Sequence, residues 1–386
     1  MAWRKIEAGA RTGQAPRCRR VLHVVGRMNP GGVETWLVHV LRRMDAAKVR
    51  QDFLVLGEAG AYAGEVRRAG GRLLRAADPA RQPLAFLRDF SRVLRDAGPY
   101  DVVHCHVHHF GGVVLWAARL AGVPTRISHS HLDTESVDAG AGALRRAYFA
   151  LSRAWIRQHA THLLAVGTGA ARALFGPGFV GDPRYRLFSC GVDFSRFAEP
   201  VDRAALRRAL GLPVDAKVIG NVGRLEPQKN HEFLLEVVAH APDVHAVIVG
   251  DGALRAPLRS LARRLGVEPR VVWAGPRTDV ERILPALDAF VFPSLFEGLG
   301  LAALEAQACG LPCIVSEAVP AEVAIVPELV RHLPVEAGAE FWAEEILRTI
   351  DSPRPLGAAE ALRALRLSRH DVDVSAHALE LLYLAG

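Results

Sequence analysis

Residues 291–312 read VFPSLFEGLGLAALEAQACGLP and carry the strongest indication of the fold. This stretch begins as the end of a buried strand, 289–292, and continues through a turn and a glycine-spaced loop into a helix, 301–308, rich in Ala, Leu, Glu and Gln. Gly310 and Pro312 end that helix. A helix N-terminus beneath a glycine loop attracts phosphate through its unpaired N–H groups and its dipole. The stretch therefore predicts an α/β unit with an anion site at the carboxyl end of a strand.

Two carboxylates in the same stretch, Glu297 and Glu305, stand eight residues apart. Gly298 and Gly300 allow backbone N–H groups to approach a ligand without a Cβ clash. A carboxylate beside phosphate is repelled by it, but it accepts hydrogen bonds from sugar hydroxyls well. The segment thus predicts a nucleotide-sugar site. Taken alone, the spacing of the two glutamates also fits an amphipathic helix with one solvated glutamate.

Length and composition place the chain among globular proteins. Its 386 residues are enough for two domains, half are hydrophobic and 23% are charged. The formal net charge is +7, but the arginines are scattered and form no basic tract, so no nucleic-acid partner is expected. A basic face could instead contact an anionic membrane or hold an anionic substrate.

Cysteine usage and the absence of a long apolar run predict the location. The five cysteines include no CxxC pair, which favours a reducing, cytoplasmic setting: Cys18, Cys105, Cys190, Cys309 and Cys313. No apolar run reaches the length of a membrane span, and the polar start of the chain is no secretory signal. Residues 1–19 are expected to be a disordered tail.

The first half of the chain alternates strands and helices. A strand at 20–25 leads into GRMNPGGVETW, where Gly31 and Gly32 form a turn before a helix at 34–44. The loop resembles a P-loop only in its glycine spacing, since Gly32 and Val33 replace Lys and Ser/Thr. Further strands at 53–57 and 101–105 predict a parallel doubly wound sheet, with ligands at the carboxyl ends of its strands.

Two histidine clusters follow predicted strands. The first is DVVHCHVHHF, and the second is ISHSH after a strand at 125–128; their histidines are His104, His106, His108, His109, His129 and His131. Alternating histidines suggest a metal site, but no acidic ligand lies within the first cluster. We therefore expect no metal, and polar groups lining a cleft instead.

The second half opens with a strand at 217–221 and the loop GRLEPQKN. Arg224 and Lys229 both belong to this loop, and two cations there match a diphosphate that gains charge as it leaves. The alternative is a pair of solvated surface cations. A tight turn follows at Gly250, but Arg255 stands where a dinucleotide fingerprint needs its third glycine.

These motifs resemble those of retaining GT-B glycosyltransferases of family 4. The resemblance runs from about residue 20 to 384 and is closest to bacterial enzymes of exopolysaccharide and capsule assembly, through GGVETW, HxHxHHF, ISHSH, QKNH and EGLGLAALEAQACGLPC. It implies an α/β GT-B fold: two Rossmann-like doubly wound domains facing across a cleft. It implies an N-terminal acceptor domain at 20–192, a nucleotide-sugar domain at 200–365 and a C-terminal segment at 366–386 that crosses back to the first domain.

The resemblance also implies roles for individual residues. Glu297 would contact the donor sugar and Glu305 the ribose, while His129, or alternatively His131, would stand near the reacting sugar and acceptor. His129, Arg224, Lys229 and Glu297 are the expected catalytic residues. The expected donor-binding residues are Gly31, Gly32, Gly223, Arg224, Lys229, Gly250, Pro276, Arg277, Glu297, Gly298, Leu299, Gly300, Leu301 and Glu305. The expected acceptor-binding residues are His106, His108, His109 and His131.

The implied activity is transfer of a hexose, most simply from a UDP-sugar, to a hydroxyl of a growing, lipid-linked glycan. GT-B enzymes supply with cationic side chains what GT-A enzymes take from a metal, so the resemblance implies neither metal nor cofactor. A cytoplasmic protein with peripheral contact to the inner face of the plasma membrane fits this role. Two alternatives are a sugar-nucleotide epimerase of the same fold and a non-catalytic nucleotide-sugar-binding protein.

Overall fold

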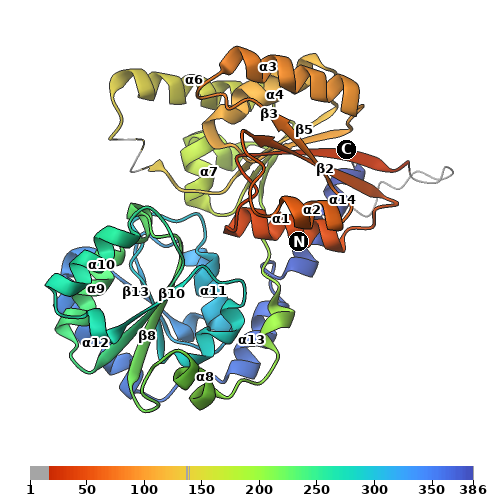
Figure 1. Ribbon diagram of the computed structural model, residues 1–386. Helices are drawn as coiled ribbons and strands as arrows, with labels where there is room; N and C mark the ends of the chain where they lie inside the picture. The colour runs from red at the N-terminus through yellow and green to blue at the C-terminus, as the bar shows by residue number, and fades with distance from the viewer. Residues whose placement is uncertain (1–16, 136–137, 139, 386) are drawn as a thin grey trace. The chain divides into compact units, whose positions relative to one another are not determined.

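The structure is a computed structural model that describes residues 17–135, 138 and 140–385 (Figure 1). The chain divides into two compact units. Unit 1 holds the described residues up to Gly191 together with the C-terminal segment from Val372, and unit 2 is Val192–Asp371. Most of the predicted tail lies outside the described residues, but its last residue, Arg19, begins a strand.

Unit 1 is built on a seven-stranded parallel sheet of order β3-β2-β1-β4-β5-β6-β7. The strand order reverses direction beside β1, as in doubly wound folds, so that the carboxyl ends of β1 and β4 flank a switch point. The strands are β1 (Arg19–Val25), β2 (Val49–Leu56), β3 (Arg72–Ala76), β4 (Val102–Cys105), β5 (Thr125–Ser130), β6 (His162–Ala165) and β7 (Tyr185–Leu187).

Helices cover both faces of this sheet, so its central strands are buried on both sides. The helices are α1 (Gly32–Arg43), α2 (Ala63–Arg68), α3 (Pro83–Arg92), η3 (Val93–Ala97), η4 (His108–Phe110), α4 (Gly111–Leu120), α6 (Ala143–His159), α7 (Thr168–Phe175) and η5 (Pro177–Gly181). The last helix of the chain, α14 (Val372–Ala385), returns to unit 1 and packs on α1, β1 and β2. Trp36 on α1 donates to Ser375 Oγ on α14 at 3.1 Å.

Unit 2 holds a six-stranded parallel sheet of order β10-β9-β8-β11-β12-β13. Its strands are β8 (Lys217–Val222), β9 (Val244–Val249), β10 (Val271–Gly275), β11 (Ala289–Phe292), β12 (Cys313–Ser316) and β13 (Val330–Leu333). The longer helices are α8 (Arg203–Ala209), α9 (His231–His240), α10 (Arg255–Arg264), α11 (Leu301–Ala308), α12 (Ala339–Asp351) and α13 (Ala358–Arg366). Short turns of helix connect them: η6 (Phe194–Phe197), η7 (Pro227–Lys229), η8 (Glu268–Arg270), η9 (Val280–Arg282), η10 (Leu284–Ala286), η11 (Ala321–Val323), η12 (Pro327–Leu329) and η13 (Val335–Ala337).

The doubly wound fold and the returning C-terminal helix predicted from the sequence are confirmed, but the structure differs from the sequence analysis at three strands. The strand predicted at 125–128 extends to Ser130, because His129 and Ser130 still pair with β6. Residues 72–76 form a strand that the sequence reading missed. The apolar run at 313–316 predicts the last strand of the chain, but β13 follows it in sequence and pairs beside it.

Candidate active site

The glycine loop of residues 298–300 turns directly into α11 in unit 2. Gly300 is the residue before the helix and has φ +89°, a left-handed conformation that favours glycine. Gly298, Leu299 and Gly300 are buried, and Leu301 is half-buried. The strand β11 and the helix α11 start and end where the sequence predicts them, because every local signal there agrees.

Lys229 and Glu297 form an ion pair at the carboxyl edge of the same sheet. Lys229 Nζ donates to Glu297 Oε1 at 2.5 Å, and the side chains are 15% and 6% exposed. The ammonium group also lies 4.6 Å from the centre of the Phe292 ring at the end of β11. The sequence predicted both residues as site members but did not predict that they contact each other.

Two glycines hold the backbone close beneath Lys229. A Cβ on Gly223 would lie about 3.1 Å from Lys229 Cε, so the lysine side chain packs over this glycine. A Cβ on Gly250, which has φ +140°, would lie 1.9 Å from the Gly223 carbonyl oxygen. Gly250 therefore allows the turn after β9 to pack against the loop that carries the cations.

The other predicted cations of unit 2 are more exposed. Arg224 pairs with Glu226 at 3.0 Å, and its side chain is 59% exposed. Arg277, which follows the exposed Pro276, forms two hydrogen bonds with Asp279, and these raise the arginine pKa. In this structure both arginines are thus held by a neighbouring carboxylate on their own loop.

Glu305 is isolated in a way that Glu297 is not. Within the described chain it makes no hydrogen bond or ion pair, and burial raises its pKa from 4.5 to about 7, while Arg196 opposes part of that shift. The residue is half-buried, so a carboxyl group without a donor in the chain remains able to accept hydrogen bonds from a ligand. This state fits the predicted grip on ribose hydroxyls.

Other buried polar atoms in unit 2 also have no partner within the described chain. They include Asn221 Oδ1 at the end of β8, both ring nitrogens of His231 at the start of α9, and Ser294 Oγ after β11. Burial and the nearby Lys229 lower the pKa of His231 to about 4, so its ring is neutral. The sequence reading singled out none of these three residues.

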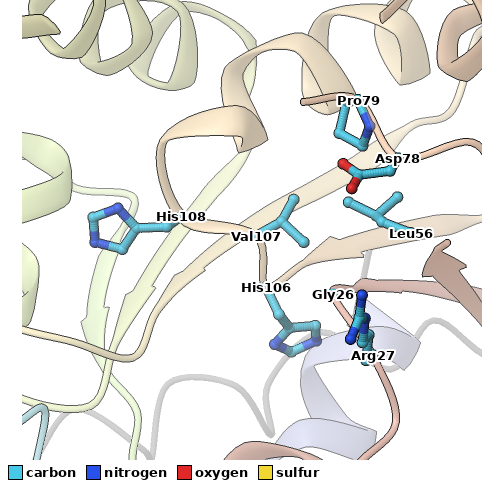
Figure 2. A pocket seen from close by; sticks show the side chains of 8 residues that line it. All are labelled: Gly26, Arg27, Leu56, Asp78, Pro79, His106, Val107 and His108. Atoms are coloured by element: carbon cyan, nitrogen blue, oxygen red, sulfur yellow. The ribbon is translucent and has the colours of Figure 1, made fainter. Parts of the chain in front are cut away.

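In unit 1, a pocket of about 410 Å³ opens at the carboxyl ends of β1, β2 and β4 (Figure 2). Figure 2 shows the His106 ring beside Gly26 and Arg27, while the His108 ring turns away from Leu56, Asp78 and Pro79. His106 and His108, both predicted from the resemblance as acceptor-binding residues, are among the residues that line this pocket. The lining residues are Gly26, Arg27, Leu56, Asp78, Pro79, His106, Val107 and His108.

Behind this pocket lies a hydrogen-bonded row of histidines. His23 Nε2 lies 3.0 Å from Gln51 Oε1, and His23 Nδ1 lies 3.1 Å from His106 Nε2. His106 Nδ1 lies 2.8 Å from His131 Nε2, and Cys190 Sγ lies 3.6 Å from His131 Nδ1. Because the Gln51 oxygen can only accept, each neutral ring donates toward Gln51 and accepts from the next, and the Cys190 thiol donates at the far end.

A second row runs beside the first. The Phe188 carbonyl accepts from His129 Nε2 at 3.0 Å, so His129 Nδ1 accepts from His104 Nε2 at 3.2 Å. Tyr383 of α14 then donates to His104 Nδ1 at 2.7 Å. Burial lowers the pKa of His23 to about 4 and that of His129 to about 3, which keeps these rings neutral.

His129 does not lie where the sequence predicts it. It was predicted to follow its strand, but it lies inside β5 and is 1% exposed, with both ring nitrogens bonded. Its predicted catalytic role therefore requires a movement that breaks one of these bonds. His131, directly after β5, is half-buried and also has both ring nitrogens engaged.

Among the other predicted residues of unit 1, His109 is buried and pairs with Asp138, Nε2 to Oδ2 at 3.0 Å. Gly31 precedes α1 in an extended conformation, and Gly32 begins the helix. A Cβ on Gly31 would lie 2.7 Å from Glu34 Oε2, so a carboxylate of the chain itself already stands at this helix N-terminus. That carboxylate would oppose a phosphate placed there.

Two groups of three histidines could hold a metal ion by distance, namely His23, His104 and His106, and His106, His129 and His131. The hydrogen bonds of the two rows occupy the ring nitrogens of all five. A metal would have to displace several of those bonds. His23 was missed from the sequence, where the available signal is a histidine inside the predicted strand 20–25, like His104 inside the predicted strand 101–105; the structure pairs the two in register.

The comparisons with known proteins agree with this geometry. Residues 31–191 match the glycosyl transferase 4-like domain, and residues 202–363 match glycosyl transferases group 1. The chain is 36% identical to EpsF of Bacillus subtilis (strain 168), which carries the name of a glycosyltransferase, over 87% of this chain and 89% of that protein.

This chain belongs to the group 1, family 4-like glycosyltransferases. It is 35% identical to a UDP-Gal:alpha-D-GlcNAc-diphosphoundecaprenol alpha-1,3-galactosyltransferase of Escherichia coli, over 56% of this chain and 58% of that enzyme. Among solved structures, Anabaena Alr3699/HepE in complex with UDP and glucose superposes with a TM-score of 0.78 at 21% identity, covering 94% of this chain and 98% of that one. The transferase WaaG of lipopolysaccharide biosynthesis superposes with a TM-score of 0.72 at 18% identity, covering 95% and 100%. These structures confirm the GT-B fold.

Proposed function

We propose that this glycosyltransferase is a retaining, metal-independent hexosyltransferase that uses a UDP-sugar. Its acceptor would be a hydroxyl of a lipid-linked glycan in exopolysaccharide or capsule synthesis. The observation that carries the proposal is the set of Lys229, Glu297 and Glu305 around one helix N-terminus. The names of two relatives, one a galactosyltransferase acting on a diphosphoundecaprenol acceptor and one solved with UDP and glucose, support the donor and the acceptor class.

The proposed donor site is organised by charge. Lys229 would donate to the diphosphate while it still holds Glu297, and Arg224 would turn from Glu226 to add a second cation. These cations stabilise the charge that develops on the leaving nucleoside diphosphate. Glu305 would accept from the ribose hydroxyls and Glu297 from the hexose. The same-face attack expected of a retaining enzyme would leave the departing phosphate to take the acceptor proton.

We also propose that the chain works at the cytoplasmic side of a membrane. The described residues include no helix with the length and hydropathy needed to cross a bilayer. A lipid-linked acceptor and a net charge of +7 both favour peripheral contact with an anionic surface.

The experiment is incubation of the chain with UDP-, GDP- and ADP-linked hexoses, followed by measurement of free nucleotide and of the sugar. Slow release of UDP from one UDP-hexose, accelerated by a lipid diphosphate glycan and giving a product of retained anomeric configuration by NMR, supports the proposal. An interconverted sugar without release would show an epimerase. Binding without either reaction would show a non-catalytic binding protein.

A further inference from the structure

Helix α6 of unit 1 carries an apolar stripe that faces water. Leu144, Tyr148 and Leu151 are 87%, 44% and 57% exposed. Their spacing of four and three residues places them on one side of the helix. Ala147, Ala150 and Ala154 around them are exposed too, so no polar side chain interrupts the stripe. The opposite side, with Phe149 and Ile156, is buried in the unit.

The charge on this helix has one sign. Among its 17 residues α6 has no aspartate or glutamate, and its arginines are Arg145, Arg146, Arg153 and Arg157. Two of them, Arg146 and Arg157, are exposed and fall on one edge of the exposed side at helical spacing, whereas Arg153 between them is half-buried and donates to the Ala173 carbonyl at 3.2 Å. The neighbouring helix α4 also has no acidic residue and adds Arg119. A stripe of apolar side chains bordered by arginines is the pattern of a helix that lies in the interface of an anionic bilayer.

The apolar surface continues from α6 onto α4 and α3. Trp155 of α6 lies 5.7 Å from Trp116 of α4, measured between ring centroids. Trp116 borders a groove of about 510 Å³ between α4 and the helices α3 and η3, lined by Leu87, Ser91, Leu94, Arg95, Trp116, Ala117, Leu120 and Ala121. Leu120 at the rim is 70% exposed. Figure 1 shows α3, α4 and α6 together in the same part of unit 1.

We propose that the surface formed by α4, α6 and the groove beside α3 is the site at which this enzyme binds an anionic lipid bilayer. Leu144, Tyr148 and Leu151 enter the boundary between headgroups and acyl chains, while the flanking arginines contact lipid phosphates. Each arginine near such a surface adds favourable electrostatic energy, and the apolar residues add burial. The inference rests on the proposed lipid-linked acceptor, since such an acceptor is presented at a membrane.

The charge of the helix favours a bilayer over a second copy of the chain. Two copies joined through α6 would bring eight arginines together with no carboxylate from either α6, which is repulsive. An anionic lipid surface supplies many phosphates at no fixed spacing and so suits scattered arginines.

The test is sedimentation of the full chain with vesicles of phosphatidylglycerol and, separately, of phosphatidylcholine. We expect binding to phosphatidylglycerol that weakens with salt, and little binding to phosphatidylcholine. The variants Leu144→Ser/Leu151→Ser and Arg146→Gln/Arg157→Gln should each reduce binding on the order of 10-fold or more. Matched controls in unit 2 are Leu367→Ser, at a residue 82% exposed, and Arg263→Gln/Arg264→Gln on α10.

If the unaltered chain does not bind phosphatidylglycerol, or if the α6 variants bind as well as the controls, the proposal is overturned. A concentration-dependent dimer that the α6 variants abolish would also overturn it. Release of UDP from a UDP-sugar in solution reports the proposed function separately. If the chain releases UDP from a UDP-sugar but does not bind vesicles, only the membrane surface is refuted. If it binds vesicles but does not release UDP, only the proposed chemistry is refuted.

Discussion

The carboxyl edges of the two sheets are built from opposite kinds of polar group. In unit 1 the edge is formed by five neutral histidines whose ring nitrogens are all hydrogen-bonded, ending at Tyr383 and Cys190. In unit 2 it is formed by charges and by unpartnered groups, with Lys229 on Glu297 and with Glu305 alone. The comparison teaches that a satisfied polar network stabilises one geometry, whereas unsatisfied groups wait for a ligand.

The largest loss of turnover is expected from removing a cation of the proposed donor site in unit 2. Lys229→Ala should lower turnover by about 10²-fold or more, because it removes a donor to the developing charge on the leaving group. Arg224→Ala should also lose turnover by about 10²-fold if that arginine leaves Glu226 for the diphosphate. Turnover within about 3-fold of the parent in both variants, measured at saturating donor, would show that the diphosphate lies elsewhere.

Loss of Lys229 also leaves Glu297 buried without its partner, which destabilises the fold by itself. The double variant Lys229→Ala/Glu297→Gln removes that unpaired charge. It should recover melting temperature relative to Lys229→Ala and should still turn over more slowly than Glu297→Gln alone. If the double variant turns over as fast as Glu297→Gln, the loss in Lys229→Ala came from instability and not from lost catalysis.

Variants of the carboxylates Glu297 and Glu305 should lose different properties. Glu305→Gln should weaken UDP binding by about 10-fold, because the ribose grip acts alike in ground and transition states. Glu297→Gln should bind UDP nearly as before and lose turnover instead. Calorimetric affinity for UDP and turnover at saturating donor, measured on both variants, decide between them; equal loss of UDP affinity in the two contradicts this division.

Glu305 also predicts a change in stability with a definite pH dependence. In the unfolded chain it ionises near pH 4.5, but in the folded chain only near 7, so folding loses stability as pH rises through that range. Glu305→Gln should therefore raise the melting temperature at pH 8 by a few degrees, an effect of about 1 kcal/mol or more in a domain of this size. At pH 4 the two proteins should melt alike, and an equal shift at both pH values would refute the carboxyl as its source.

The buried histidines of unit 1 should make the stability of the folded chain fall at acid pH. The pKa of His23 is lowered to about 4 and that of His129 to about 3, while unfolded histidines take up protons near 6.5. The unfolded chain therefore binds more protons below pH 6.5, and stability should fall as pH drops from 6.5 toward 4. His23→Leu should flatten that decline in thermal melts, and His240→Leu, on α9 of unit 2, is the control. If the melting temperature of His23→Leu falls with pH as steeply as that of the parent, the histidine row does not cause the decline.

The smallest effect is expected from metal removal. Because the five imidazoles already satisfy one another, EDTA should leave UDP release within about 2-fold of its starting rate, as expected where side-chain cations take the role of a metal. Added Zn²⁺ should not raise the melting temperature. Loss of activity that a divalent ion restores would make the histidine edge a metal site and remove the contrast between the two units.

Much of this structure could be predicted because neighbouring residues carried independent signals that agreed. The strand 289–292, the glycine loop and the helix 301–308 are fixed by an apolar run, glycines and helix formers within twenty residues. The loop that carries Arg224 and Lys229 could be predicted for the same reason, because the signals that define it are also close together in the sequence. The strand at 72–76 could not be predicted in this way. Arginines stand at its first and fourth positions, so its residues do not indicate a strand by themselves, and only the pairing with β2 makes it one.

The residue types at each strand end, and hence the chemistry available at the sheet edges, follow from the sequence alone, since parallel strands bring their carboxyl ends to one edge. Tertiary structure alone decided which of them meet. Sequence distance does not encode that Lys229 contacts Glu297, 68 residues away, or that Tyr383 reaches His104 across 279 residues. Such pairs form because burial removes water and leaves each polar atom only the partners that packing brings near.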